Sequence, residues 1–241
     1  MKNGERSMEN GVILYEDNHI MAVNKRAGEI VQGDKTGDVP LCELLKQHIK
    51  ARDGKPGNVF LGVPHRLDRP VSGVALFAKT GKALERLNEL FRNNEIHKTY
   101  WAVVKRRPAP DSAMLTHYLG RNEKLNKSFV ADETRPGAKE ARLQYTLLCS
   151  AEQYHLLEVL LFTGRHHQIR CQLAAIGCPI KGDLKYGASR SNPDGSISLH
   201  ARAVELVHPV KKEKLTIVAP TPPDTLWQWF ENQMTKCPSN R

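Results

Sequence analysis

Short apolar segments of strand length recur along this chain and constrain its fold more than any other feature. The clearest is 74–78, which turn residues bound on both sides. Segments of this length that are rich in β-branched, aromatic and other apolar residues are typical of β-strands. We expect further strands at 12–15, 19–23, 98–105, 141–149, 155–162, 198–206 and 214–218.

Helical periodicity is clearest at 82–94, where Leu84, Leu87 and Phe91 recur at spacings of three and four residues and charged residues cover the other face. Further helices are expected at 39–49, after 165, and from 222 to 230. Residues 106–140 contain several prolines and no regular apolar pattern, so we expect one or two short hairpins or an irregular excursion there. A chain of 241 residues with 40% hydrophobic content can form one large domain or two small ones.

The charge of the chain favours an anionic partner. Lys and Arg total 36 against 26 for Asp and Glu, which gives a formal net charge of +10. Nucleic acid is a better candidate than a membrane, because no apolar run approaches the ~18 residues that a membrane span needs. The N-terminus leads into no apolar signal core, and the five cysteines are scattered without a Cys-x-x-Cys pair. We therefore expect a cytoplasmic protein without disulfides, structural zinc or other bound metal.

One carboxylate, Asp68, lies between Arg66 and Arg69 just before the strand predicted at 74–78. Pro70 stiffens the chain after it, and Ser72-Gly73 provides a turn. Loops on a rigid scaffold often carry catalytic groups. An ion pair of Asp68 with one of its two neighbouring arginines is the simpler interpretation of this stretch alone.

The segment 163–170 places Arg165, His166 and His167 where a helix is predicted to begin. Cations are disfavoured there by the helix dipole, whereas free amide donors and cations together suit a phosphate group. Arg170 follows one turn after His166. A structural role for Arg170 remains open on the pattern alone.

Several common kinds of catalytic site find no support. The chain has neither a Gly-x-x-x-x-Gly-Lys-Ser/Thr loop nor a Gly-x-Gly-x-x-Gly motif, and it has no Gly-x-Ser-x-Gly elbow. The pair His166-His167 lacks the spacing of a zinc protease helix. What remains is a single carboxylate served by arginines, with Tyr100 on a strand that could approach it. An ionised aspartate is a competent nucleophile or base.

Five short motifs follow one another along the chain. They are His65-Arg66-Leu67-Asp68 with Ser72-Gly73, Lys98-x-Tyr100-x-Ala102-x-Val104, Thr163-Gly164-Arg165-x-His167-Gln168-Ile169-Arg170, Pro179-Ile180-x-Gly182-Asp183-x-x-Tyr186-Gly187, and Leu199-His200-Ala201. This ordered set resembles the RluA-type family of RNA pseudouridine synthases. With the flanking strands, the resemblance spans roughly residues 12–220. Val71 and Gln172 depart from the family pattern, which often has threonine and histidine there.

The resemblance implies an α+β fold with a curved, mostly antiparallel mixed sheet, and with helices and loops around a central catalytic cleft. It implies isomerisation of uridine to pseudouridine in ribosomal or transfer RNA, without metal or organic cofactor. Asp68 would be the catalytic carboxylate, Arg170 would pair with it, and Tyr100 would stack near the target base and assist proton removal. The expected substrate-binding residues are Arg66, which would help to flip the uridine out of its helix, and Arg165, His167 and Ile169.

The domain organisation expected from this resemblance is one catalytic domain at 11–234, with flexible ends at 1–10 and 235–241. Too few residues precede Asp68 for the S4 RNA-binding module that many relatives carry, so RNA would bind to the basic surface of the catalytic domain itself. We expect a monomer. The competing function is a non-catalytic RNA-binding or ribosome-assembly factor on the same fold. An aspartate-dependent hydrolase is a remote third, because no second carboxylate supports it.

Overall fold

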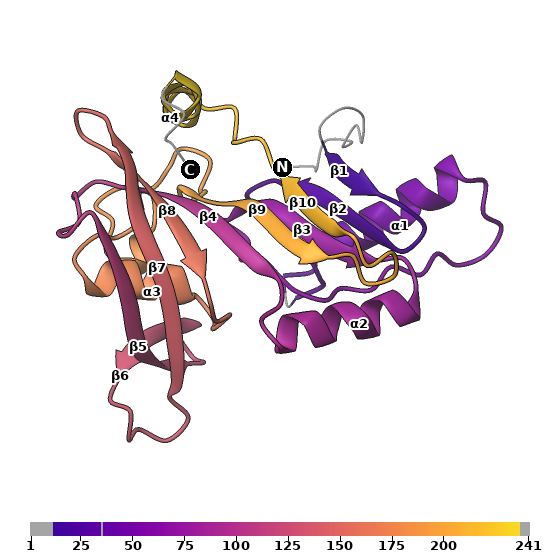
Figure 1. The fold of residues 1–241 in the computed structure, drawn as a ribbon, viewed down its shortest axis with the longest axis horizontal. Helices are drawn as coiled ribbons and strands as arrows, with labels where there is room; N and C mark the ends of the chain where they lie inside the picture. Colours follow the sequence, from indigo (N-terminus) through magenta and orange to yellow (C-terminus); the bar gives the residue numbers. More distant parts are fainter. Residues whose placement is uncertain (1–11, 35, 237–241) are drawn as a thin grey trace.

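Ten strands form one hydrogen-bonded sheet in the computed structural model, which describes residues 12–34 and 36–236 (Figure 1). They are β1 (Ile13–Glu16), β2 (Ile20–Lys25), β3 (Ser72–Ala78), β4 (His97–Val104), β5 (Ser112–Asn122), β6 (Lys127–Ala131), β7 (Lys139–Ser150), β8 (His155–Leu161), β9 (Leu199–Val207) and β10 (Lys214–Val218). The order across the sheet is β1-β2-β3-β9-β4-β8-β7-β5-β6, with β10 paired to β9. Every strand pair is antiparallel except β3 with β9. The predicted mixed, mostly antiparallel sheet is confirmed.

The sheet changes direction in its middle. Figure 1 shows β5 to β8 on one side and β1 to β3 with β10 on the other, with β4 and β9 between them. The pairing of β4 with β9 shifts register between Thr99 and Tyr100. A bulge of this kind bends a strand and re-aims the side chains beside it.

Four α-helices lie around the sheet in the described residues: α1 (Leu41–Arg52), α2 (Gly81–Arg92), α3 (Gln168–Ala175) and α4 (Thr225–Lys236). A short 3-10 helix, η1 (Leu184–Tyr186), follows α3. The amphipathic pattern of α2 buries Ala83 and Leu87, and its first turn is capped by the Thr80 hydroxyl, which accepts from the Ala83 N–H at 3.1 Å. None of these helices combines the length and the apolar character needed to span a lipid bilayer.

Apolar side chains pack on both faces of the sheet. One buried cluster joins Leu45 of α1 and Leu173 of α3 to residues of β3, β4 and β8. A second cluster joins Leu87 of α2 to the opposite faces of β2 and β3 and to β9 and β10. Asp68 lies in the loop that leads into β3. Because β3 packs in both clusters, the end of this loop has a fixed position.

Of the two alternatives expected for residues 106–140, the hairpin is the one observed. It is formed by β5 and β6, and β5 is longer than the short strand expected there. The apolar pattern of β5 and β6 is weak because one face of this hairpin is exposed. Met114 is 53% exposed and Val130 is 43% exposed. The flexible tail expected from 235 is wrong at its start, because α4 continues to Lys236. The tails expected at 1–10 and 237–241 lie outside the described residues.

Candidate active site

The loop that carries Asp68 is fixed at both ends. Before Asp68, the chain pairs with β3 through a bridge between Gly62 and Ala78, and His65 Nε2 accepts a hydrogen bond from the Leu76 N–H at 2.9 Å. After Asp68, the ammonium of the fully buried Lys25 donates to the carbonyl oxygens of Arg69 at 3.1 Å and Val71 at 2.6 Å. The backbone of Asp68 is therefore held by two different parts of the molecule.

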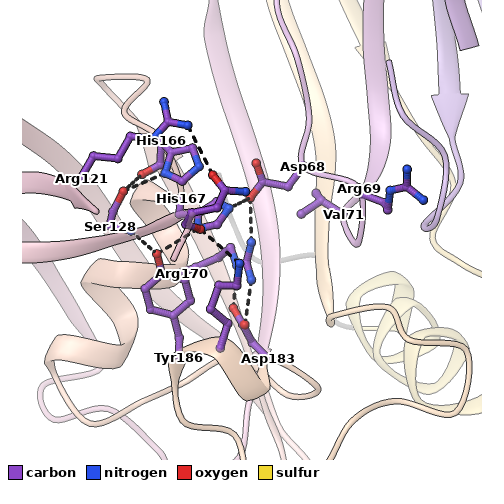
Figure 2. A network of polar contacts seen from close by, with 12 residues as sticks. Asp68, Arg69, Val71, Arg121, Ser128, His166, His167, Arg170, Asp183 and Tyr186 are labelled. Atoms are coloured by element: carbon purple, nitrogen blue, oxygen red, sulfur yellow. Dashed lines mark hydrogen bonds and ion pairs between the residues drawn. The ribbon is translucent and has the colours of Figure 1, made fainter. Parts of the chain in front are cut away.

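The Asp68 carboxylate meets Arg170 of α3. Arg170 Nη1 lies 3.0 Å from Asp68 Oδ2, and the Arg170 side chain is 6% exposed. The other guanidinium donors bind Asp183, with Nε 2.7 Å from Oδ2 and Nη2 2.8 Å from Oδ1 (Figure 2). Burial lowers the pKa of Arg170, but Asp183 and Asp68 together outweigh this and hold the pKa above its ordinary value. One arginine thus connects an accessible carboxylate to a fully buried one.

His167 approaches the same carboxylate oxygen from a second side, as Figure 2 shows. It adopts a left-handed conformation with φ 51° immediately before α3, and its Nε2 lies 3.5 Å from Asp68 Oδ2. Its Nδ1 lies 3.0 Å from the Tyr186 hydroxyl, which in turn accepts from the Ser128 N–H at 2.8 Å. The His166 ring stacks on the His167 ring with 3.8 Å between the two centroids.

Burial and the neighbouring Arg170 lower the pKa of His167 to about 2, so the imidazole is neutral near pH 7. The Tyr186 hydroxyl already accepts one hydrogen bond and can donate its proton to Nδ1, which leaves the imidazole proton on Nε2, facing Asp68. The contact of His167 with Asp68 is therefore polar and not an ion pair. Both contacts of Asp68 fall on Oδ2, and among the described residues no hydrogen bond is made to Oδ1.

Tyr100 lies on β4 and lines the same pocket as Asp68. Tyr100 is 8% exposed, and its hydroxyl makes no hydrogen bond to any residue that the structure describes. Burial and the negative charge of Asp68 raise the pKa of Tyr100 above that of an ordinary phenol. A phenol in this state stays protonated at neutral pH, which suits stacking and hydrogen-bond donation better than removal of a proton.

The pocket above Asp68 has a volume of about 720 Å³ and a strongly cationic lining. Asp68 is the one carboxylate among its described lining residues, which include the cations Arg66, Arg92, Lys98, Arg121, Arg165 and Arg170. Of these cations, Arg170 alone forms an ion pair with a described carboxylate. The pocket therefore combines one reactive carboxylate with an excess of positive charge.

Each residue predicted for the site lines this pocket. Arg66 is exposed and makes no ion pair with Asp68. Arg69 turns away and binds Asp38 at 2.7 Å, so the simpler interpretation, in which a neighbouring arginine holds Asp68, is wrong (Figure 2). Arg165 donates from Nε to the Glu140 carbonyl at 2.8 Å, and Ile169 is 5% exposed at the pocket wall.

The cation-rich segment lies at the N-terminus of α3, as predicted. Helix α3 begins at Gln168, so Arg165 and His166 precede it and His167 is its N-cap residue. The side-chain oxygen of Gln168 folds back to accept from the Arg165 N–H at 2.9 Å and from the Thr163 hydroxyl at 2.8 Å. These bonds hold the cations at the pocket edge.

Sequence reasoning assigned no role to Lys25, Asp183 or Tyr186, although the last two belong to a quoted motif. The departure at position 172 is also structural, because Gln172 is fully buried and its Nε2 donates to the carbonyls of Leu115 and Ala141 at 3.2 and 3.0 Å. Val71, the other departure, is buried beneath the pocket.

Nowhere in the described part of the chain do three or more histidine, cysteine, aspartate or glutamate side chains gather as a metal site requires. The four described cysteines, Cys42, Cys149, Cys171 and Cys178, are free thiols.

Comparison with known proteins gives one consistent result. The family model described as RNA pseudouridylate synthase matches residues 19–175. The ribosomal large subunit pseudouridine synthase D of Xylella fastidiosa is 34% identical over 228 residues, which cover 88% of this chain and 66% of that protein. The tRNA pseudouridine synthase C of Salmonella typhi is 32% identical over 228 residues, covering 86% of this chain and 84% of that protein. The chain thus spans slightly less than two thirds of some curated relatives.

Among solved structures, human RNA pseudouridylate synthase domain containing 4 is similar over 92% of both chains, with a TM-score of 0.75 and 25% sequence identity. The match extends across both halves of the sheet, since it covers nearly the whole chain.

Proposed function

Because the chain belongs to the RNA pseudouridylate synthase family, we propose that it isomerises uridine in structured RNA to pseudouridine. The observation that supports this most directly is the state of Asp68. Asp68 lines a cationic pocket, Arg170 and His167 hold its Oδ2, and its Oδ1 has no hydrogen-bond partner among the described residues. A fixed carboxylate with one free oxygen is suited to attack or to proton transfer.

The proposed reaction exchanges bonds within one nucleotide. The bond from ribose C1′ to uracil N1 breaks, a bond from C1′ to C5 forms, and the proton lost from C5 is balanced by one gained at N1. No oxidant or reductant is needed. Asp68 Oδ1 can add to the base, attack C1′ or remove a ribose proton to form a glycal, and the same held geometry serves each of these routes.

Arg170 and Tyr100 have distinct parts in this proposal. Arg170 orients Asp68, because a guanidinium that is held by Asp183 offers a fixed donor. Tyr100 stacks on the uracil and, as a neutral phenol, donates a hydrogen bond to it. A uridine stacked in a helix cannot present its glycosidic bond to Asp68, so the nucleotide must be flipped out. Arg66, which is exposed and lines the pocket, is proposed to occupy the vacated space.

The substrate is proposed to be ribosomal or transfer RNA. Relatives named for each of these substrates match most of the chain. Five cations of the pocket lining lack a carboxylate partner among the described residues, and these can bind phosphate groups. We propose that the protein acts as a monomer in the cytoplasm. What supports a monomer is that Asp68, Arg170 and Tyr100 line one pocket of a single chain.

The test is the variant Asp68→Asn. We expect it to abolish pseudouridine formation and to leave RNA affinity within about threefold of the wild type, because the amide keeps the shape of the side chain but is neither a nucleophile nor a base. Pseudouridine is mapped across the RNA of a deletion strain that carries each version. Asp111→Asn is the matched control, because Asp111 is exposed and outside the pocket.

The competing function, a non-catalytic RNA-binding or assembly factor, predicts a different result. In that case Asp68→Asn would restore growth and ribosome assembly as well as the wild-type protein does, and no pseudouridine would depend on the gene. Restoration of every modification by the variant would also refute the catalytic assignment.

A further inference from the structure

Lys98 is one of the five pocket cations without a carboxylate partner among the described residues, and the proposed reaction gives it no specific position on the RNA. It lies on β4 two residues before Tyr100, and both side chains line the pocket. Residues i and i+2 of a strand point to the same face, and their Cα atoms are separated by roughly 6.6 Å. A nucleotide whose base meets Tyr100 therefore brings its own backbone within reach of Lys98.

The surroundings of Lys98 leave its charge uncompensated. Among the residues that the structure describes, no carboxylate lies within ion-pair distance of it, and it donates no hydrogen bond. Its Nζ lies 5.9 Å from the centroid of the Phe91 ring, at the outer limit of a cation–π contact. Gly164 is also near, since a Cβ on it would lie 3.9 Å from Nζ, and the positive charge of Lys98 acts on His65, whose pKa it lowers together with burial.

Partial burial of this ammonium lowers the pKa of Lys98. A buried charge without a partner costs free energy, and an anion that enters the pocket recovers it. An ammonium is a strongly hydrated point charge, for which a phosphate oxygen is a better partner than a neutral uracil carbonyl. Asp68, the one carboxylate among the described residues of the pocket lining, forms its ion pair with Arg170 and none with Lys98.

We propose that Lys98 binds a backbone phosphate of the nucleotide whose base is placed against Tyr100. This inference rests on the proposed function, because RNA is the polyanion that delivers phosphate to the pocket. Arg66 and Arg92 line the same pocket and lack a described carboxylate partner, so they can bind the neighbouring phosphates. Lys98 then sets the depth to which the flipped nucleotide enters.

The test compares Lys98→Met with Lys98→Arg and with Lys82→Met. Lys82 is exposed on α2 and outside the pocket, so it controls for the loss of one positive charge. The probe is unmodified RNA from a strain that lacks the gene, separated into ribosomal and transfer RNA. Dissociation constants are measured over a range of salt concentrations, and pseudouridine formation is followed in the same preparations.

We expect Lys98→Met to weaken binding roughly tenfold or more, as the loss of a charged hydrogen bond does. The slope of log affinity against log salt concentration should fall in magnitude by about 0.7, the value for one phosphate contact to a single strand. Lys98→Arg should restore the slope, and Lys82→Met should match the wild type. The melting temperature of Lys98→Met should equal or exceed that of the wild type, because an uncompensated charge has been removed.

An unchanged salt slope in Lys98→Met would overturn the inference, whatever happens to the rate, since a contact with uracil or a purely structural role releases no counterion. A fall in melting temperature without a change in slope would overturn it in the same way. If Lys98→Met does not fold, Lys98→Gln takes its place under the same criteria. Failure of the proposed function is separate, because the wild-type protein would then form no pseudouridine in either RNA fraction.

Discussion

At the scale of single residues, the site depends on the five-donor geometry of Arg170. Two donors bind Asp183 and a third binds Asp68, while the guanidinium carbon lies 5.1 Å from the centroid of the Tyr186 ring. A lysine could not hold two carboxylates in one plane, since its ammonium is a point charge without a fork. The buried carboxylate of Asp183 therefore orients Asp68 indirectly, by fixing the guanidinium of Arg170.

Asp183→Asn tests this dependence. Asp183 is 1% exposed, and its loss leaves Arg170 with only one carboxylate. We expect a loss of about 3–5 kcal/mol in the free energy of unfolding, the usual cost of removing one partner of a buried ion pair. The kcat should fall at least tenfold, because Arg170 no longer fixes Asp68. Urea unfolding and single-turnover kinetics measure the two effects.

Asp111→Asn is again the control, because Asp111 pairs with Arg107 on the surface and both side chains are more than half exposed. It should change neither stability nor rate measurably. Wild-type kcat in a folded Asp183→Asn protein would show that Asp68 does not depend on its buried neighbour.

Only part of this arrangement was predictable from the sequence. The expected contact of Arg170 with Asp68 came from motifs separated by about a hundred residues, because the resemblance joined them. Lys25 could not be found in this way. Lysine is almost never fully buried, and the three carbonyl oxygens that accept from Lys25 carry no side-chain signature in the sequence.

At the scale of elements, the short parallel contact between β3 and β9 locates the Asp68 loop. It consists of Ser72 opposite His200 and Gly73 opposite Ala201. Gly73 has φ +112°, and a Cβ added to it would lie 2.2 Å from the Ala201 carbonyl oxygen. Only glycine permits this approach of the two strands directly after the catalytic loop.

Gly73→Ala should therefore lower the free energy of unfolding by about 2 kcal/mol or more, because the strained φ and the backbone clash add. Gly81→Ala provides the matched control. Gly81 opens α2, and a Cβ there meets nothing within 4 Å. That variant should be neutral or stabilised by up to about 1 kcal/mol. Thermal unfolding of the two variants measures the difference. Equal melting temperatures of Gly73→Ala and Gly81→Ala would refute the requirement for glycine at position 73.

The central strands were predictable because both faces of them are buried, as the apolar run at 74–78 shows. The hairpin of β5 and β6 was expected only as one of two alternatives and without bounds, because exposed apolar and polar residues alternate irregularly along these strands. The pairing of β5 with β7 supplies their stability, and no local pattern records a partner so distant in the sequence. Helix α3 begins only at Gln168, because His167 adopts a left-handed conformation. Residue type alone does not reveal this conformation.

At the scale of the whole molecule, buried histidines couple stability to pH. Burial lowers the pKa of His65 to about 3, of His167 to about 2 and of His200 to about 4, against an ordinary value of 6.5. Each is neutral in the folded protein at pH 5 and protonated in the unfolded chain. The unfolded state thus binds more protons, and stability must fall as the pH drops below about 6.5.

From pH 7 to pH 5 we expect each of these histidines to remove about 1–2 kcal/mol from the free energy of unfolding. The carboxylates with lowered pKa, such as Asp17, act in the same direction but only below their ordinary value of 3.8, so they do not contribute in this window. Urea unfolding in steps of half a pH unit measures the slope. His65→Gln keeps an acceptor for the Leu76 N–H but cannot be protonated, so its slope should be shallower by the share of one histidine. If its slope equals that of the wild type, the pKa of His65 does not differ between the folded and unfolded states, and this histidine does not couple stability to pH.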